Sequence, residues 1–261
     1  MTTYWDANTY DAIAPPMQRW ADDLLREVYL QGHETVLDAG CGSGIATLKL
    51  AEKIPSGQLY AVDSSREMIG ALQARLAAWP GTCKVTPVQA SLTDFSLPAP
   101  VDYVFSNAVF HWITNDAALF GNLHRATRPG GMMRAQCGGA GNLARVYQAV
   151  KIAQADDRFR VHFVDLQDGK IYRSPLYLET VLKYDGWRPQ SISLFEAPVP
   201  LPDAAAAVQY LRAIVLRDHV ARLPEDLRQP YLEAVVEAYG REFGEAFVLD
   251  YVRVDFMATR I

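Results

Sequence analysis

The chain has 261 residues, of which half are hydrophobic and 21% are charged, and its formal net charge is −5. This composition is typical of a globular protein with a substantial core, and the length suits one large α/β domain or a domain with an appended cap. The acidic balance disfavours a protein that binds a nucleic-acid backbone, because such proteins usually carry a basic surface.

The first residues and the cysteines of the sequence disfavour further classes of protein. Residues 1–6 lack the basic segment and the apolar run of a secretory signal. No stretch approaches the roughly 20 apolar residues that a membrane-spanning helix needs. The three cysteines are far apart and include no Cys-x-x-Cys pair, which disfavours a zinc site or a disulfide framework. We therefore expect a cytoplasmic protein with reduced thiols, no metal and no membrane partner.

The first half of the chain alternates short apolar runs with amphipathic stretches. Residues 1–30, which include Tyr4, Trp5, Tyr10 and Trp20, are expected to form helices that cover the site. Strands are then predicted at residues 36–38, 59–62, 85–88, 101–106 and 132–136. Helices are predicted at residues 45–54, 64–77 and 116–127, and Ser64 with Glu67 three residues later resembles a capping box. A turn is expected at Arg128-Pro129-Gly130-Gly131, before the last of these strands.

The second half contains longer helical patterns. Helices are predicted at residues 142–155, 174–184, 203–218 and 225–243, and strands at residues 191–195 and 247–260. Strands that alternate with helices of this length indicate a Rossmann-like, doubly wound α/β fold. We expect seven mostly parallel strands with an antiparallel last strand. The expected division is an N-terminal segment (1–30), a core (31–200 and 245–261) and a helical cap (201–244) inserted between the last two strands.

The strongest motif runs from Val36 to Gly44, where an apolar strand leads into a Gly-x-Gly-x-Gly turn and then a helix. Glycines allow positive φ and close approach of a ligand, and the N-terminus of the next helix offers free N–H groups. A dinucleotide fingerprint would place its third glycine at the position of Ile45, so the nicotinamide pattern fails. Asp38, two residues before the first glycine, would pair with an amino group and not with a pyrophosphate.

Asp63 follows the second predicted strand. An acidic side chain at this place can accept hydrogen bonds from both hydroxyls of a ribose. The alternative is that Asp63 only caps the helix that begins near Ser65. Together with the glycine turn, its position favours the binding of a nucleoside.

Four segments resemble class I S-adenosylmethionine-dependent methyltransferases. Residues 36–44 resemble the first motif of that family, and Ala61-Val62-Asp63-Ser64 resembles the second. The segment from Ser106 to Trp112 resembles the residues after strand four in the trans-aconitate methyltransferase group, and residues 128–131 resemble the turn before strand five. The resemblance is specific from Glu34 to Gln136.

This resemblance implies S-adenosylmethionine as the cofactor and assigns roles to individual positions. Asp38 would lie near the amino group and Asp63 at the ribose, with Ser64 and Met68 beside the adenosine. The segment from Ala90 to Leu92 would contact adenine, although many relatives have an acidic residue where this chain has Ser91. The remaining implied contacts are to the methionine part and the sulfonium, from Gly40, Gly42, Gly44, Asn107 and Phe110.

His111 is the candidate catalytic residue, since histidine is the most common general base. Tyr10 is a second candidate. The alternative is that His111 and Trp112 begin a helix and fill the core.

The acceptor is less constrained. The chain lacks the Asn-Pro-Pro-Tyr segment that is typical of relatives that methylate amide or adenine nitrogens, so we expect a small-molecule substrate. A carboxylic acid is one candidate, because a carboxylate is ionised at neutral pH and needs no base. An anionic substrate would require an arginine clamp. The candidates are Arg145, Arg158, Arg160, Arg173, Arg212 and Arg217.

Other functions stay open at this stage. The fold could bind the cofactor without transferring a methyl group, or could methylate nitrogen or carbon of a small metabolite. A nicotinamide oxidoreductase is disfavoured by Ile45 and Asp38, and a macromolecule-modifying enzyme by the acidic charge. The oligomeric state cannot be read from the sequence.

Overall fold

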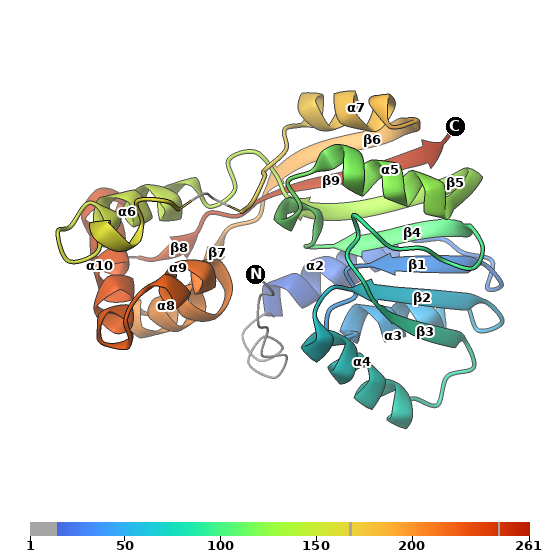
Figure 1. The fold of residues 1–261 in the computed structure, drawn as a ribbon, viewed down its shortest axis with the longest axis horizontal. Helices are drawn as coiled ribbons and strands as arrows, with labels where there is room; N and C mark the ends of the chain where they lie inside the picture. Colours follow the sequence, from blue (N-terminus) through green and yellow to red (C-terminus); the bar gives the residue numbers. More distant parts are fainter. Residues whose placement is uncertain (1–14, 167–168, 245) are drawn as a thin grey trace.

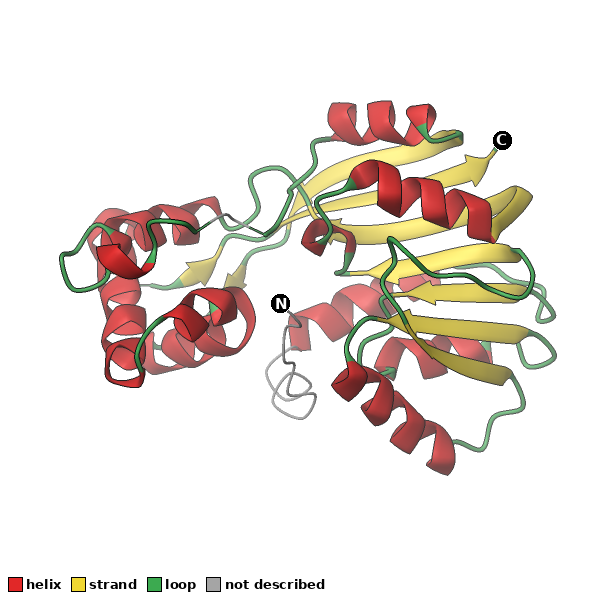
Figure 2. Ribbon diagram, viewed as in Figure 1, coloured by secondary structure: helices red, strands yellow, loops and turns green. Residues whose placement is uncertain are grey.

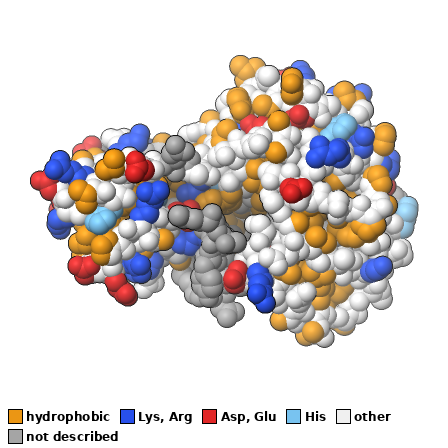
Figure 3. Space-filling model, in the orientation of Figure 1, with side chains coloured by type: hydrophobic (Ala, Val, Ile, Leu, Met, Phe, Trp, Pro, Cys, Tyr) orange, Lys and Arg blue, Asp and Glu red, His pale blue; other side chains and the backbone are white. Residues whose placement is uncertain are grey.

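A computed structural model describes residues 15–166, 169–244 and 246–261 and shows two parts (Figure 1). The larger part is a twisted sheet with helices on both faces, and the smaller part is a lobe made mainly of helices (Figure 2). No described helix is long and apolar enough to cross a membrane. Acidic and basic side chains are interspersed over the described face of the helical lobe in Figure 3.

The central sheet has seven strands in the order β3-β2-β1-β4-β5-β9-β6. Its strands are β1 (Thr35–Ala39), β2 (Gln58–Asp63), β3 (Lys84–Gln89), β4 (Val101–Asn107), β5 (Thr127–Gly138), β6 (Trp187–Glu196) and β9 (Val252–Arg260). Strands β1 to β5 pair in parallel, whereas β9 lies antiparallel between β5 and β6. The predicted fold class is therefore confirmed.

Helices cover both faces of the sheet because the strands are apolar on both sides. In β1, Val36 packs on one face and Leu37 on the other, as expected from the two-residue repeat of a strand. One face carries α2 (Pro15–Arg26), α3 (Ile45–Glu52) and α4 (Arg66–Ala78), and the opposite face carries α5 (Asp116–Ala126) and α7 (Pro175–Tyr184) (Figure 1).

The helical lobe has its own hydrophobic core. Its elements are α6 (Ala144–Gln154), the short η2 (Arg160–His162), α8 (Ala204–Tyr210), α9 (Arg217–Arg222), α10 (Glu225–Phe243) and a ribbon of β7 (Val199–Pro200) and β8 (Val248–Leu249). The cluster also includes Met17 and Trp20, so α2 packs against the lobe. Helix α6 packs against α10 in this lobe. The residues of α6 lie outside the range 201–244 that was expected to form the cap. The division into segments 1–30, 31–200 with 245–261, and 201–244 stays a prediction.

The prediction of one continuous helix at residues 203–218 is wrong. A π-helical turn, η3 (Leu211–Val215), separates α8 from α9, and Leu216 N–H donates to the carbonyl of Leu211 at 2.7 Å. Such turns widen a helix locally and are frequent at functional sites. Here the turn supplies Ile214 and Val215 to a cavity that faces the sheet.

Two other strand predictions are corrected. Strand β5 begins at Thr127, so residues 128–131 lie within it, and the pairing with β4 shifts register between Val101 and Tyr103. The single closing strand predicted at residues 247–260 is divided into β8 and β9. The strand is interrupted between β8 and β9, because the carbonyl of Asp250 accepts a hydrogen bond from Leu143 N–H and not from a neighbouring strand.

Candidate active site

The glycine motif lies at the carboxyl end of β1, between β2 and β4, where parallel sheets bind their ligands. Gly40 has φ +84° and Gly42 has φ +52°, and both line the cleft beside this edge. A Cβ at Gly40 would lie 2.3 Å from Cγ2 of Val109, whereas no described atom lies within 4 Å of a Cβ at Gly42. Gly40 therefore permits close packing inside the protein, and Gly42 leaves open space for a ligand.

Gly44 has a different role from the other two glycines. It is the left-handed N-cap of α3, with φ +92°, and a Cβ there would lie 2.4 Å from Cδ1 of Leu72. It is absent from the described residues that line the cleft. Gly44 thus joins α3 to α4 by close packing, and its predicted contact with the cofactor stays a prediction.

Asp63 is tied to the glycine loop. Its carboxylate accepts hydrogen bonds from Gly42 N–H at 3.0 Å and from Ser65 N–H at 2.9 Å. Burial raises the pKa of Asp63, although these hydrogen bonds act in the opposite direction. The N-cap of α4 is Ser65, whose Oγ accepts from Met68 N–H, so the capping box predicted from Ser64 and Glu67 does not form. Ser64 is left to line the cleft.

The largest cavity at this edge has a volume of about 460 Å³ and is lined by Asp63, Ser64, Met68, Ser91 and Leu92. These residues follow β2 and β3, so the structure brings the predicted adenosine side together. Their mixture of apolar walls and a carboxylate suits a nucleoside.

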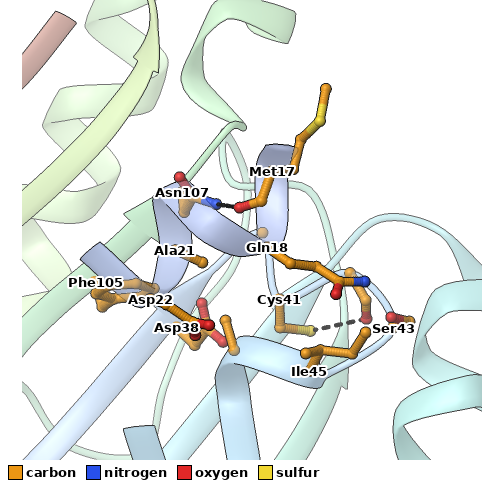
Figure 4. Close-up of a pocket in the computed structure, with 13 residues that line it drawn as sticks. Met17, Gln18, Ala21, Asp22, Asp38, Cys41, Ser43, Ile45, Phe105 and Asn107 are labelled. Atoms are coloured by element: carbon orange, nitrogen blue, oxygen red, sulfur yellow. Dashed lines mark hydrogen bonds between the residues drawn. The ribbon is translucent and has the colours of Figure 1, made fainter. Parts of the chain in front are cut away.

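Asp38 and Asn107 line a second cavity of about 80 Å³ beside the glycine loop (Figure 4). Asp38 accepts a hydrogen bond from Thr47 Oγ1 at 2.7 Å, and burial, with a smaller effect of Asp63, raises its pKa to about 7. Nδ2 of Asn107 donates to the carbonyl of Met17 at 3.2 Å, the bond drawn in Figure 4. Its buried Oδ1 has no hydrogen-bond partner among the described residues. An ammonium group fits these two acceptors.

Phe110 does not line the described cavities beside the glycine loop, and its predicted contact with the sulfonium end stays a prediction. Its ring packs in the core against Phe120 and Phe256, at centroid distances of 5.8 and 6.2 Å. Ala108 adopts φ +61°, a strained conformation for a residue with a Cβ. After this reversal Val109, not Phe110, lines the cleft.

A third cavity, of about 40 Å³, lies between the sheet and the helical lobe and has a basic lining. Lys170 and Arg253 both line it, and Ala108 and Trp112 line both this cavity and the larger one. Nζ of Lys170 lies 4.7 Å from the centre of the Trp112 ring. Sequence reasoning missed both cations, because Arg253 lies within β9 and Lys170 in a loop without a motif.

The arginines named from the sequence fall in other places. Arg173 is buried and pairs with Asp116, and its Nη1 donates to the carbonyl of Phe110 at 2.9 Å, so it holds the structure together. Arg217 lines the large cavity from α9. The other four do not line the cofactor cavities or the basic cavity: Arg145, Arg158, Arg160 and Arg212.

His111 is buried and lines the basic cavity. Burial, followed by the nearby cations Arg253, Lys170 and Arg173, lowers its pKa well below the usual value. The second catalytic candidate, Tyr10, lies outside the described residues, as do Tyr4 and Trp5. No group of metal-binding side chains occurs within the described ranges.

Comparison with known proteins agrees with this geometry. Residues 36–131 match a family described as a methyltransferase domain. A trans-aconitate 2-methyltransferase from Azoarcus sp. (strain BH72) is 39% identical over 132 residues, which is 51% of this chain and only 50% of that protein. Another from Acidovorax sp. (strain JS42) is 29% identical over 93% of this chain and 90% of its own length.

A solved structure extends the comparison to the whole fold. A mycolic acid cyclopropane synthase in complex with S-adenosylhomocysteine has a TM-score of 0.60 at 17% identity, and the match covers 93% of this chain and 84% of that one. The solved structure shares the fold of this chain, and the predicted cofactor, S-adenosylmethionine, agrees with the matched methyltransferase domain. The chain is therefore similar to the class I S-adenosylmethionine-dependent methyltransferases and, within them, to the trans-aconitate methyltransferase group.

Proposed function

We propose that this chain transfers a methyl group from S-adenosylmethionine to a carboxylate oxygen of a small organic acid. The observation that carries the proposal is the basic cavity, which adjoins the large cavity at Ala108 and Trp112. Its described lining includes Lys170 and Arg253 and no acidic side chain. Ammonium and guanidinium groups form charge-assisted hydrogen bonds with carboxylates, which favours an anionic acceptor.

The charges on the cofactor side also support transfer from a cationic donor to an anionic acceptor. Asp22 and Asp38 line the cavity beside the glycine loop, and Asp63 lines the large cavity. S-adenosylmethionine carries a sulfonium and an ammonium group, so acidic side chains suit the donor. An acidic donor side next to a basic acceptor side matches a cationic methyl donor and an anionic acceptor.

The residues around the glycine loop would hold the cofactor by its polar groups. Oδ1 of Asn107 and the carboxylate of Asp38 would accept from the ammonium group. Asp63 would accept from the ribose hydroxyls with the lone pairs that Gly42 and Ser65 leave free. Adenine would lie against the apolar side chains of Met68 and Leu92 in the large cavity, beside Ser91.

When bound, the cofactor supplies an electrophilic methyl group: a C–O bond to the acceptor forms while the C–S bond breaks, and its electron pair passes to sulfur. The contribution of the protein is to hold the acceptor oxygen in line. The guanidinium of Arg253 is fixed for this task, since its Cζ lies 4.4 Å from the centre of the Trp20 ring and its Nε donates to Oε1 of Gln136 at 3.3 Å. A carboxylate is ionised at neutral pH, so the transfer needs no general base.

The relatives suggest the first acceptor to assay. Those named trans-aconitate 2-methyltransferase match most of this chain, so trans-aconitate is the acceptor we propose to try first, followed by other small acids. The proposal includes an intracellular setting with reduced thiols, which is supported by the free, buried state of Cys41, Cys83 and Cys137.

The test is transfer of a labelled methyl group from S-adenosylmethionine to trans-aconitate and a panel of mono- and dicarboxylic acids. We expect a labelled product that releases methanol in alkali, because methyl esters hydrolyse and N-methyl or C-methyl products do not. Labelled product that resists alkali, or no transfer to any acid by folded protein that binds S-adenosylhomocysteine, would contradict the proposal.

A pair of variants tests the basic cavity itself. Arg253→Met keeps much of the side-chain volume but removes the charge, and kcat/KM should fall about tenfold to a hundredfold, which is the usual effect of losing a charged hydrogen bond to substrate. Arg145→Met removes an exposed arginine on α6 and should change little. Equal activities of the two variants would argue against binding of the acceptor at Arg253.

A further inference from the structure

The side chain of His111 is fixed in position. It belongs to the short helix η1 (Phe110–Trp112), which follows directly after β4. Its ring stacks on Tyr172 at a centroid distance of 5.9 Å and an interplanar angle of 26°, and it is tilted against Trp112 at 5.3 Å. With aromatic neighbours at these distances, the imidazole has little freedom to rotate.

A backbone contact identifies the tautomer of the ring. Gly138 N–H points at Nδ1 of His111 with an N···N distance of 3.4 Å. A backbone N–H can only donate, so Nδ1 accepts, and in a neutral ring the proton then lies on Nε2. The nitrogen that could serve as a base is therefore engaged with the backbone.

The surroundings of His111 keep the ring neutral. The cations that face it are Arg253 from β9 and Lys170 and Arg173 from the segment before α7, and each lowers its pKa in addition to burial. Other titratable groups nearby include Tyr172, against which it stacks, Cys137, whose buried thiol has a raised pKa, and Tyr251, which lines the same cavity. A neutral ring in this setting can donate one hydrogen bond from Nε2 and cannot readily gain a proton.

We infer that His111 is a fixed, neutral hydrogen-bond donor that orients the acceptor carboxylate through Nε2–H, and that it is not a general base. The inference rests on the proposed function for the identity of the acceptor. His111 lines the same cavity as Lys170 and Arg253, so the three donors can act on one anion. A neutral donor binds an oxygen more weakly than a cation does, and therefore withdraws less charge from the oxygen that attacks.

The tautomer can be tested without any activity. The sequence contains five histidines, so a protein labelled with ¹⁵N in histidine gives a spectrum that single variants can assign. We expect the His111 signals to show a proton on Nε2 and a lone pair on Nδ1, unchanged between pH 5.5 and 8.5. A proton on Nδ1, or titration within this range, would overturn the inference even if no acid is methylated.

The role in orientation is tested by matched variants with trans-aconitate as the acceptor. The amide nitrogen of His111→Gln can take the place of Nε2, whereas the amide of His111→Asn reaches only the place of Nδ1. We expect His111→Asn to lose about tenfold to a hundredfold in kcat/KM, and His111→Gln to recover a large part of this loss. His33→Gln, at an exposed position, serves as the control.

Two readouts separate orientation from a merely structural effect. The affinity for S-adenosylhomocysteine and the melting temperature should be similar for the two His111 variants. The activity of the wild type should not depend on a group with a pKa between 5.5 and 8. Equal losses in the two variants, or an acidic limb in the pH profile that disappears in His111→Gln, would show that the residue acts in another way.

Discussion

Replacement of Gly40 by alanine tests the packing of the glycine loop. Gly40 has φ +84°, and a Cβ would lie 2.3 and 2.5 Å from the two γ-carbons of Val109. A left-handed backbone costs a residue with a Cβ about 1–2 kcal/mol, and one extra methyl group in a packed site costs about 1–3 kcal/mol. We therefore expect Gly40→Ala to lower the free energy of unfolding by about 2–5 kcal/mol.

Two variants isolate the steric part of this effect. Gly42 also has a positive φ, but no described atom lies within 4 Å of a Cβ added there. Gly42→Ala should therefore lower the free energy of unfolding by only about 1–2 kcal/mol. The double variant Gly40→Ala/Val109→Ala removes the overlapping methyl groups and should be less destabilised than the sum of its single changes. Urea unfolding followed by circular dichroism gives the free energies. If Gly40→Ala were as stable as Gly42→Ala, the reasoning from close packing would be refuted.

Two further predictions concern buried charges. Because burial raises the pKa of Asp38 to about 7, folded Asp38 keeps a proton that the unfolded chain loses near pH 4, so the free energy of unfolding should fall as pH rises from about 4 to 7. Ionisation of Asp38 should also raise the affinity for S-adenosylhomocysteine between pH 6 and 8 in calorimetry, and Asp38→Asn should lose this dependence; an unchanged dependence in the variant would assign it to another group. Arg173→Met leaves the carboxylate of Asp116 without its buried partner and should cost about 3–5 kcal/mol in chemical denaturation, whereas a loss below about 0.5 kcal/mol would contradict a structural role for the pair.

The cofactor side could be predicted from the sequence because its signals are local. The residues from Val36 to Gly44 lie on one strand–loop–helix unit, and Asp63 follows the next strand. Parallel strands place their carboxyl ends at one edge, so short motifs are sufficient to predict that these residues meet. The order of strands and helices was predictable for the same reason.

The basic cavity, which we propose as the acceptor side, could not be predicted, because its residues are distant in sequence and carry no periodic signal. Lys170 and Arg253 line one cavity only because β9 is inserted beside β5. Arg173 looked as suitable as either of them, and only its contacts with Asp116 and two carbonyls show that its charge is already used.

Backbone conformation explains two local differences from the predicted pattern. The positive φ of Ala108 brings Val109 to the cleft where Phe110 was expected, and alanine gives no warning of such a conformation. The π-helical turn at residues 211–215 has the same apolar pattern as an ordinary helix, so its wider hydrogen bonding is invisible in the sequence.

The position of β9 has a consequence for folding during synthesis. Strands β5 and β6 both precede β9 in the chain, yet neither pairs with the other, because β9 lies between them. Domains begin to fold from the N-terminal side as the chain emerges, so the loop between β1 and α3 can form while β6 still lacks its partner. Arg253 arrives with β9 itself. Completion of the sheet and delivery of this cation to the basic cavity are thus a single late event, which follows formation of the edge that carries the glycine loop.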